Sequence, residues 1–276
     1  MATRLMTLAA GLSLLAGATG AAAQTFDCLI DPAQVLRLGG VTSGSLASVQ
    51  VERGDLVEAG QVVATLDSDL ERASIELLRL RANSRETIEA YQAELDLARK
   101  QLERVQALVE RNVASVATID ELIAEVSVAE RNVANAELDQ KVAQMELRRA
   151  EVQLERRQIL SPISGLVVNR LLSPGEYLTA DGSVVILAQL DPLHVEVFVP
   201  TALYGQIEVG GTALVTPEEP IGGEYQAVVT TVDQVFDTAS GTFGVRLTLP
   251  NPDRTLPGGL RCQVTFGPGN QNDQLK

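Results

Sequence analysis

Tryptophan is absent from this chain, and aromatic residues make up only 3% of its 276 residues. A compact enzyme with a deep apolar pocket usually carries more aromatic side chains. The single histidine, His194, lies in a strand-like alternating segment, where a structural role is typical. Catalysis needs a convergent set such as Ser, His and Asp, and neither such a set nor a nucleotide-binding fingerprint is present. These absences argue against an enzyme.

Patterns for metals, cofactors and nucleic acids are missing as well. His194, Cys28 and Cys262 do not have the spacing of metal ligands. Basic residues number 22 against 36 acidic residues, which makes the net charge −14. Such an excess of acid argues against nucleic acid or anionic lipid as the main partner. We therefore expect no cofactor, no metal and no nucleic-acid partner.

The N-terminus has the three parts of a secretory signal peptide. Arg4 precedes an apolar run from Leu5 to Ala18, and the small residues Ala21-Ala22-Ala23 end it. We expect cleavage after residue 23 and export of the remaining chain. An uncleaved anchor is the alternative, but the run is shorter than the roughly 20 residues that span a bilayer.

Only two cysteines are present, Cys28 and Cys262. An exported protein lies in an oxidising compartment, where a disulfide between them would tie the N-terminal segment to the last predicted strand. Two separate buried thiols are the alternative, and the sequence does not choose between them.

Glycine and proline are both missing from Gln61 to Ser161, so this window can hold long helices. An apolar heptad pattern runs from Ile119 to Leu154, and Gln140 is its one polar member. A similar pattern runs from Leu70 to Val109, with one extra step of four near Ser84 that we interpret as a stutter.

A short break between the two heptad patterns predicts that the chain reverses. The break covers residues 112–117, and Thr118 with Glu121 forms a capping box that restarts a helix. We therefore predict an antiparallel helical hairpin over residues 69–157, with arms of about 40 residues and a length of about 60 Å. One continuous coiled coil that dimerises is the alternative.

The two flanks of this hairpin repeat each other. Ser43-Gly44 recurs as Ser164-Gly165, and Gly54 recurs as Gly175, both at an offset of 121. Each copy, over residues 35–68 and 159–191, predicts short strands joined by glycine turns. Because neither copy has enough apolar residues for its own core, we expect them to form one split β-domain.

The remaining chain predicts a second β-structure. Short alternating segments separated by Gly and Pro turns indicate a small antiparallel β-barrel over residues 192–266. Residues 267–276 are polar and predict a disordered tail.

This order of domains resembles the periplasmic adaptor, or membrane fusion protein, family (HlyD-like). The segments that carry the resemblance are Val51–Gln61, Ser161–Val167, Thr242–Arg246 and Leu256–Gly258. The resemblance implies an α+β multidomain fold, in which a long antiparallel coiled-coil hairpin is inserted in a lipoyl-like barrel-sandwich hybrid and a small β-barrel follows.

The resemblance also implies partners. Arg104, Leu108 and Ser115 follow the spacing of the family's hairpin tip, which contacts a TolC-type outer-membrane channel. Arg104 and Leu108 are one helical turn apart and share a face. The alternative is a solvated arginine and a leucine that covers the end of the apolar seam.

At the other end, the resemblance implies an inner-membrane transporter, of the resistance–nodulation–division (RND) type or, alternatively, of an ABC-type exporter or type I secretion system. It further implies self-association, as a hexamer, in the periplasm. Four arginines of the second arm are candidates for packing between copies: Arg148, Arg149, Arg156 and Arg157. Little chain is left for the membrane-proximal domain that many members have, and we expect this domain to be absent or vestigial.

Two other classes of protein compete with this interpretation. A biotin or lipoate carrier modifies a lysine at the turn between its halves, whereas Lys100 and Lys141 lie in the predicted helices and Lys276 at the C-terminus. A structural coiled-coil protein of the envelope would share the hairpin but needs neither the tip residues nor the barrel.

Overall fold

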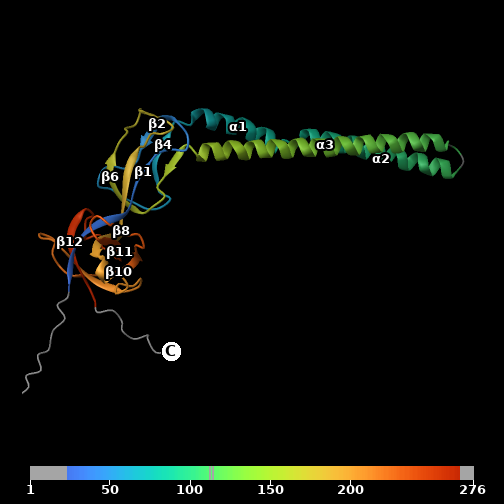
Figure 1. Cartoon of the computed structure of the whole chain (residues 1–276). Coiled ribbons are helices and arrows are strands. Elements are labelled where there is room, and N and C mark those ends of the chain that lie inside the picture. Colours follow the sequence, from blue (N-terminus) through green and yellow to red (C-terminus); the bar gives the residue numbers. More distant parts are fainter. Residues whose placement is uncertain (1–23, 112, 114, 268–276) are drawn as a thin grey trace, which may run out of the picture. The chain divides into compact units, whose positions relative to one another are not determined.

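The computed structural model describes residues 24–111, 113 and 115–267. The expected signal peptide (1–23) and all of the expected tail except Gly267 lie outside these residues. The chain forms two compact units: residues 34–189 make one, and the segments up to Ala33 and from Leu190 onward make the other (Figure 1). Strands β1 (Thr25–Leu38) and β8 (Val185–Pro200) contribute residues to both units.

The β-part of the first unit consists of two small sheets. One has the strand order β5-β4-β2-β7, and the other pairs β3 with β6 and β6 with the start of β8. The bounds are β2 Gly44–Val49, β3 Leu56–Val57, β4 Val62–Leu66, β5 Gln158–Leu160, β6 Gly165–Arg170 and β7 Tyr177–Leu178. Their core is made of aliphatic residues that include Leu46, Val63, Leu66, Ile159, Val167, Leu178 and Leu187.

The two sequence repeats exchange strands within this β-domain. The Gly54 N–H donates to the Val167 carbonyl at 2.9 Å, and the Gly175 N–H donates to the Leu46 carbonyl at 2.7 Å. The two donors, Gly54 and Gly175, are equivalent positions of the repeat, and so are the two acceptors, Leu46 and Val167. Each copy therefore supplies the hydrogen-bond acceptor for the glycine of the other copy. Gly54 and Gly175 have φ of 95° and 87°, a left-handed conformation that favours glycine. The reciprocal pairing explains why one copy cannot form the domain alone.

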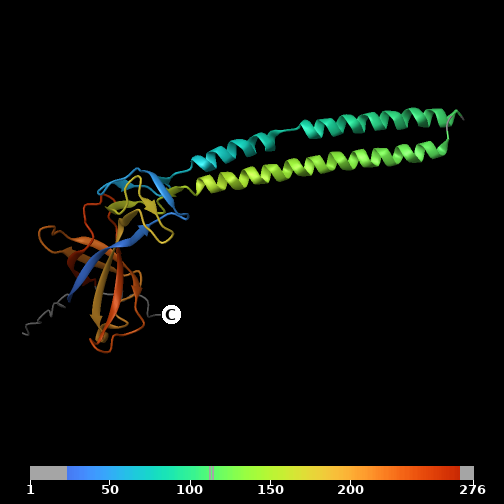
Figure 2. The same cartoon turned by 90° about the horizontal axis from the view of Figure 1, so that it is seen from above.

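Three helices leave this β-domain: α1 (Asp69–Asn83), α2 (Glu86–Glu110) and α3 (Val116–Glu155). Arg99 of α2 forms an ion pair of 2.8 Å with Glu130 of α3, and Arg157, just after α3, pairs with Glu71 of α1. Residues later in the first arm pair with residues earlier in α3, so α1 and α2 lie antiparallel to α3 (Figure 2). The chain therefore reverses between α2 and α3.

The restart of the helix differs from the prediction. α3 begins at Val116 with Ser115 as its N-cap, and the Ser115 hydroxyl accepts the Ala117 N–H at 3.2 Å. The expected capping box of Thr118 and Glu121 is wrong, because both residues already lie inside the helix. Ser115 stands earlier in the chain and satisfies a free amide of the first turn by itself.

The stutter expected near Ser84 is a complete break in the first arm. Ser84 is extended, with φ −66° and ψ 130°, and separates α1 from α2. In α2 the predicted apolar seam is correct, since Ile88 and Leu95 are buried. In α1 the predicted seam from Leu70 to Leu80 is wrong, because Ile75 and Ala82 are buried instead. The break changes the rotational phase, and the leucines of α1 turn outward.

Gln140, the one polar residue of the α3 seam, lies opposite this break. Its side-chain amide nitrogen, Nε2, donates to the Ser84 carbonyl at 3.2 Å and lies 3.5 Å from the Ala82 carbonyl. These carbonyls lack the helical partners that an uninterrupted helix would provide. The polar residue therefore serves the gap between α1 and α2.

Replacing Gln140 by alanine is expected to loosen this break. The Ser84 carbonyl loses its side-chain donor, at a cost of about 1 kcal/mol. Hydrogen exchange should become faster in the last turn of α1 and the first turn of α2, while the β-domains keep their protection. Gln153→Ala, at an exposed position of α3, is the matched control. Equal exchange in the two variants would contradict the role of Gln140.

The second unit is a closed β-structure. Its strands follow the order β1-β12-β9-β10-β11-β8, and an additional pairing of β1 with β8 closes the row. The new bounds are β9 Thr212–Pro217, β10 Tyr225–Val232, β11 Thr242–Leu249 and β12 Leu260–Phe266, and a 3-10 turn covers Thr201–Leu203. The core includes Ile30, Val195, Val215, Phe243, Leu247 and Val264.

Strand β1 was not expected from the sequence, although its alternation is visible there. Cys28 and Ile30 are buried and Phe26 is partly buried, while Asp27 and Leu29 point outward. β1 pairs with β12 in an antiparallel register that places Cys28 opposite Cys262. The two residues form a disulfide, with their Cα atoms 4.9 Å apart. Among the residues that the structure describes, none of the helices is both long enough and apolar enough to cross a membrane.

Candidate functional site: the hairpin tip and the hairpin base

The hairpin tip is formed where α2 ends and α3 begins, at the end of the hairpin away from the β-strands (Figure 2). The amides of Arg111 and Val113 both donate to the Leu108 carbonyl, at 3.2 and 2.9 Å, and so close the end of α2. Ser115 then caps α3. The loop is short because both helix ends are satisfied within a few residues.

The three predicted tip residues all lie at this end and are exposed. The Arg104 Nε donates to the Lys100 carbonyl of its own helix at 3.2 Å, which leaves the guanidinium directed along the outside of α2. Leu108 is 42% exposed, one turn further along. Ser115 is exposed too, but its hydroxyl is already used as the N-cap. Its first role is therefore structural, and Arg104 and Leu108 remain free for a partner.

Two apolar side chains at the tip were missed in the sequence. Val113 is 71% exposed and Val116 is 64% exposed. Together with Leu108 they place three aliphatic side chains around the turn, next to a cation. Apolar residues inside a predicted turn were the available signal, since turns are usually polar. Exposed aliphatic side chains of this kind on helices are typical of protein-binding surfaces.

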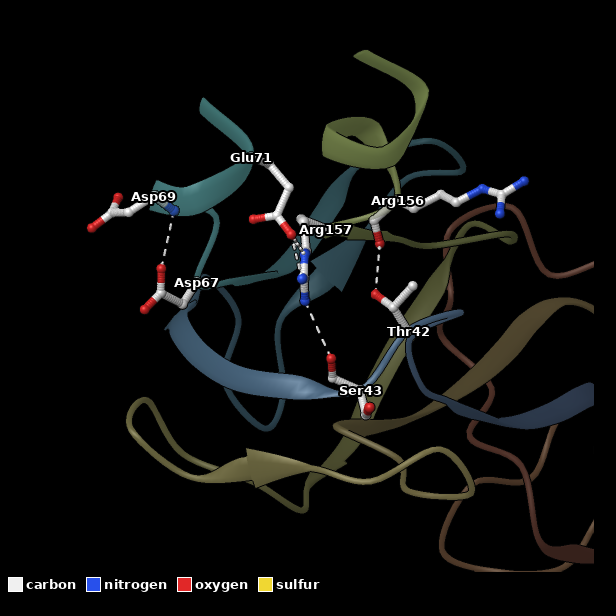
Figure 3. A network of polar contacts seen from close by, with 7 residues as sticks. All are labelled: Thr42, Ser43, Asp67, Asp69, Glu71, Arg156 and Arg157. Carbon is white, nitrogen blue, oxygen red and sulfur yellow. Dashed lines mark hydrogen bonds and ion pairs between the residues drawn. The ribbon is translucent and has the colours of Figure 1, made fainter. Parts of the chain in front are cut away.

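The hairpin base contains an ion pair that is largely shielded from solvent (Figure 3). Arg157 forms an ion pair with Glu71 through two nitrogens, with the Nε at 2.9 Å, and its Nη1 donates to the Ser43 carbonyl at 3.2 Å. The side chains of Arg157 and Glu71 are only 25% and 17% exposed. The guanidinium thus joins the end of α3, the start of α1 and the β-domain.

This geometry corrects the expectation for one of the four arginines proposed to pack between copies, because Arg157 is held inside its own molecule. Arg148, which lies 4.0 Å from Glu151 of the same helix, is still 70% exposed. Arg149 and Arg156 are exposed as well, so these three arginines remain candidates. At Arg156 only the backbone is engaged, because its carbonyl accepts the Thr42 hydroxyl at 3.5 Å.

Across residues 24–267, excluding the two undescribed tip positions, His, Cys, Asp and Glu form no group of three that could hold a metal ion. His194 lies half-buried in β8 opposite Thr248 of β11. The described residues present a hairpin tied to the β-domain at its base, a tip with exposed apolar side chains, and a barrel.

These features define a class of protein in which a split β-domain carries a helical hairpin and is followed by a β-barrel. Comparison with known families supports this class. Residues 35–189 match the model of the CzcB-like barrel-sandwich hybrid domain, and residues 192–270 match that of the CusB-like beta-barrel domain. The chain belongs to the membrane fusion protein, or periplasmic adaptor, family.

Individual relatives agree with this assignment. Macrolide export protein MacA of Yersinia pestis is 27% identical over 86% of this chain, and an uncharacterised protein of Haemophilus influenzae is 24% identical over 90%. The chain spans 66% and 58% of the lengths of these two relatives. The crystal structure of MacA from Actinobacillus actinomycetemcomitans shares the fold, with a TM-score of 0.74 and 19% identity over 88% of this chain and 78% of that one.

Proposed function

We propose that this protein is the periplasmic adaptor subunit of a tripartite efflux pump, where it links an inner-membrane transporter to a TolC-type outer-membrane channel. The observation that best supports this proposal is the hairpin tip, where Arg104 lies beside three exposed aliphatic side chains. The tip stands at the end of a long hairpin, in which the 40-residue helix α3 packs against α1 and α2. At a rise of 1.5 Å per residue such a helix is about 60 Å long, enough to reach far from the β-domain.

The mechanism is scaffolding and contains no covalent step. The tip contacts the channel with apolar area and one cation, while the barrel faces the transporter. The Arg157–Glu71 pair transmits force between hairpin and β-domain, because it holds both arms at the base. The protein acts in the periplasm after removal of residues 1–23, and its copies assemble side by side as a hexamer.

For the transporter we propose the RND type, on the interpretation that the N-terminus is a cleaved signal and not an anchor. An adaptor of an ABC-type exporter is the alternative. Purification of the intact chain from native envelopes, followed by identification of the co-purifying transporter, distinguishes them. A polytopic RND protein supports the proposal, and an ATP-binding permease overturns this part of it.

The replacement Arg104→Asp tests the adaptor role. Reversing this charge places a carboxylate among the apolar tip residues, where it disfavours the bound state, and we expect at least about tenfold loss of export. Substrate export and drug tolerance of a deletion strain that carries the variant provide the measurement. Circular dichroism and thermal unfolding should stay unchanged, since Arg104 is exposed and makes only a contact within its own helix.

Arg72→Asp is the matched control, at an exposed position in the first turn of α1 far from the tip. It has the same change of charge and should export normally. Normal export by Arg104→Asp as well would remove the tip from the proposed function.

A further inference from the structure

Helix α1 has two apolar faces, and it buries the smaller one. The inner face, which packs on α3, consists of Ile75, Leu78 and Ala82, with the half-buried Glu71 at its base end. The outer stripe consists of Leu70, Ala73, Leu77 and Leu80. Its three leucines are 80%, 52% and 74% exposed. Leaving so much aliphatic surface in water is unfavourable, so some other interaction must select the observed face.

The outer stripe is in phase with the buried seam of α2. Leu70 precedes the buried Ile88 by 18 residues, and Leu77 precedes the buried Leu95 by the same number. Eighteen residues are about five full turns of a helix, so positions with this spacing lie on the same side. One uninterrupted helix through both segments would therefore turn the outer stripe toward α3.

The inner face of α1 is out of phase with that seam. The positions that follow its three apolar residues by the same spacing are Ala93, Asp96 and Lys100, and all three are exposed on α2. Relative to an uninterrupted helix, α1 is thus rotated by roughly 150° about its own axis. The break at Ser84 is where this rotation is taken up (Figure 2).

Local sequence does not require the break. Asn83, Ser84 and Arg85 include neither glycine nor proline, and Arg85, as the N-cap of α2, makes no side-chain capping bond. A change in the backbone angles of Ser84 and Arg85 would make the helix continuous. The Ser84 carbonyl would then accept the Ile88 amide in place of the Gln140 side chain.

Two polar contacts stabilise the rotated, broken arrangement. Glu71 lies on the inner face, where it pairs with Arg157, and a rotation of α1 would carry its carboxylate away from that guanidinium. Gln140 donates to the Ser84 carbonyl, which is free only while the helix is broken. Polar contacts therefore favour one rotational phase of α1, and the apolar periodicity favours the other.

The facing surface of α3 can accept either face of α1. The residues opposite α1 are Ala143, Leu147, Ala150 and Leu154, all of them buried or half-buried. Two of the four are alanines, which leave room for larger side chains from the opposite helix. The α3 helix itself is continuous over this length and need not change.

We propose that α1 is a rotational switch with two packed states. In the second state α1 turns by roughly 150° and joins α2 in a single helix from Asp69 to Glu110, and its outer stripe is buried against α3. The ion pair between Arg157 and Glu71 opens at the same time. The hairpin thereby exchanges a tied base and an interrupted first arm for a free base and a continuous first arm. This inference goes beyond the proposed function and does not depend on what the tip binds.

Cysteine crosslinking within the full mature chain tests the second state. Arg79 lies 3.9 Å from Glu151, so positions 80 and 150 are level with each other. Leu80 points away from α3 in the observed state, whereas Ala150 is buried beneath α1. Mild oxidation of the double variant Leu80→Cys/Ala150→Cys should give an internally crosslinked monomer. Both native cysteines are bonded to each other and do not interfere.

Two further pairs use the same cysteine on α3. Leu78→Cys/Ala150→Cys reports the observed state, because Leu78 lies on the inner face. Glu76→Cys/Ala150→Cys is the matched control, since Glu76 is exposed and would face α3 in neither state. The first of these pairs should crosslink, and the control should stay reduced.

Substitutions on the two faces should shift the switch in opposite directions. Ile75→Ser removes an apolar side chain that is buried only in the observed state, so it should raise the crosslinking rate of the Leu80 pair about tenfold. Leu77→Ser removes one that is buried only in the second state, so it should lower that rate about tenfold. Circular dichroism checks that both variants keep their helices.

The opposite response to Leu77→Ser separates a rotation from simple fraying of α1, because fraying does not depend on burial of Leu77. An unchanged rate in that variant would overturn the proposal, and so would equal crosslinking of the Glu76 control. Absence of any Leu80 crosslink, even with Ile75→Ser, would exclude the second state. A crosslinked dimer in place of the monomer would show a contact between copies and would also count against it. None of these results depends on whether Arg104→Asp alters export.

Discussion

Arg157→Ala is expected to lower the thermal unfolding midpoint by roughly 5 °C and to loosen the hairpin base. Removal of the guanidinium leaves Glu71 as an uncompensated carboxylate in a site where it is only 17% exposed. Loss of one partner of a largely buried ion pair costs several kcal/mol at most, and partial exposure reduces this to about 2 kcal/mol. The Ser43 carbonyl loses a donor as well.

The change should be local in hydrogen exchange. The first turns of α1 and the last turns of α3 should exchange faster, because Arg157 connects both to the β-domain (Figure 3). Export should fall with it, since a hairpin that is loose at its base positions its tip poorly.

The neighbouring residue provides the control. Arg156→Ala removes the same kind of side chain from an exposed position, where the residue is hydrogen-bonded through its backbone. It should unfold and exchange like the unmodified protein. Equal destabilisation by the two changes would show that the ion pair is not what holds the base.

The room for this arginine is a property of the β-domain. A Cβ atom on Gly44 would lie 3.0 Å from the Arg157 Nη1. Gly44 belongs to the repeat that recurs as Ser164-Gly165, and there a Cβ on Gly165 would meet the Ala188 carbonyl oxygen at 2.4 Å. The repeated glycine thus permits close approach in both copies, but to a side chain in the first and to the backbone in the second.

Loss of the disulfide is expected to have the largest effect on the second unit. The double variant Cys28→Ser/Cys262→Ser opens a link between residues 234 positions apart in sequence. Because the bond limits the unfolded chain over so long a loop, its removal should cost about 3–5 kcal/mol of the free energy of unfolding. Denaturant unfolding measures this free energy, and hydrogen exchange of the β1 and β12 amides shows where the loss occurs.

The effect should concentrate on the pairing of β1 with β12. β1 is joined to β12 by an antiparallel ladder from Thr25 to Ile30, and the disulfide lies in its middle. In a strong reductant, the stability of the unmodified protein should fall toward that of the variant. The stability of the variant should not change with reductant. Equal stability of the two proteins under oxidising conditions would contradict a disulfide that supports the fold.

Much of the architecture followed from patterns along the chain. Strands β9 to β12 all lie within residues 192–266, where alternation predicted a small β-barrel. The seam of α3 was predicted correctly, because an unbroken helix keeps a single rotational phase over its length. The family resemblance is confirmed by both domain matches.

The first arm shows where such patterns fail. Leu70, Leu77 and Leu80 form a regular heptad pattern, and we predicted that they face the second arm. The helix breaks at Ser84, and the phase of α1 no longer follows from that of α2. Which of two apolar faces a helix buries depends on how its end is attached, and here Arg157 and Glu71 decide that attachment.

For the tip, the sequence predicted where the residues lie but not whether their side chains are exposed or hydrogen-bonded. The spacing of Arg104 and Leu108 on one face required only helical periodicity. The use of the Ser115 hydroxyl as a cap, and the exposure of Val113 and Val116, depend on where the helices end. That point is set by competition between local hydrogen bonds, which residue spacing does not resolve.

By itself, then, the sequence determined the periodic features of this adaptor: the strand-exchanging repeat, the α3 seam and the strands of the barrel from β9 to β12. Periodicity reports which residues share a face, and that is a local property. Only the tertiary structure decided which face is covered. The pairing of Cys28 with Cys262 and the ion pair at the base both join residues far apart in the chain. Contacts of that kind arise from packing, and no local pattern records them.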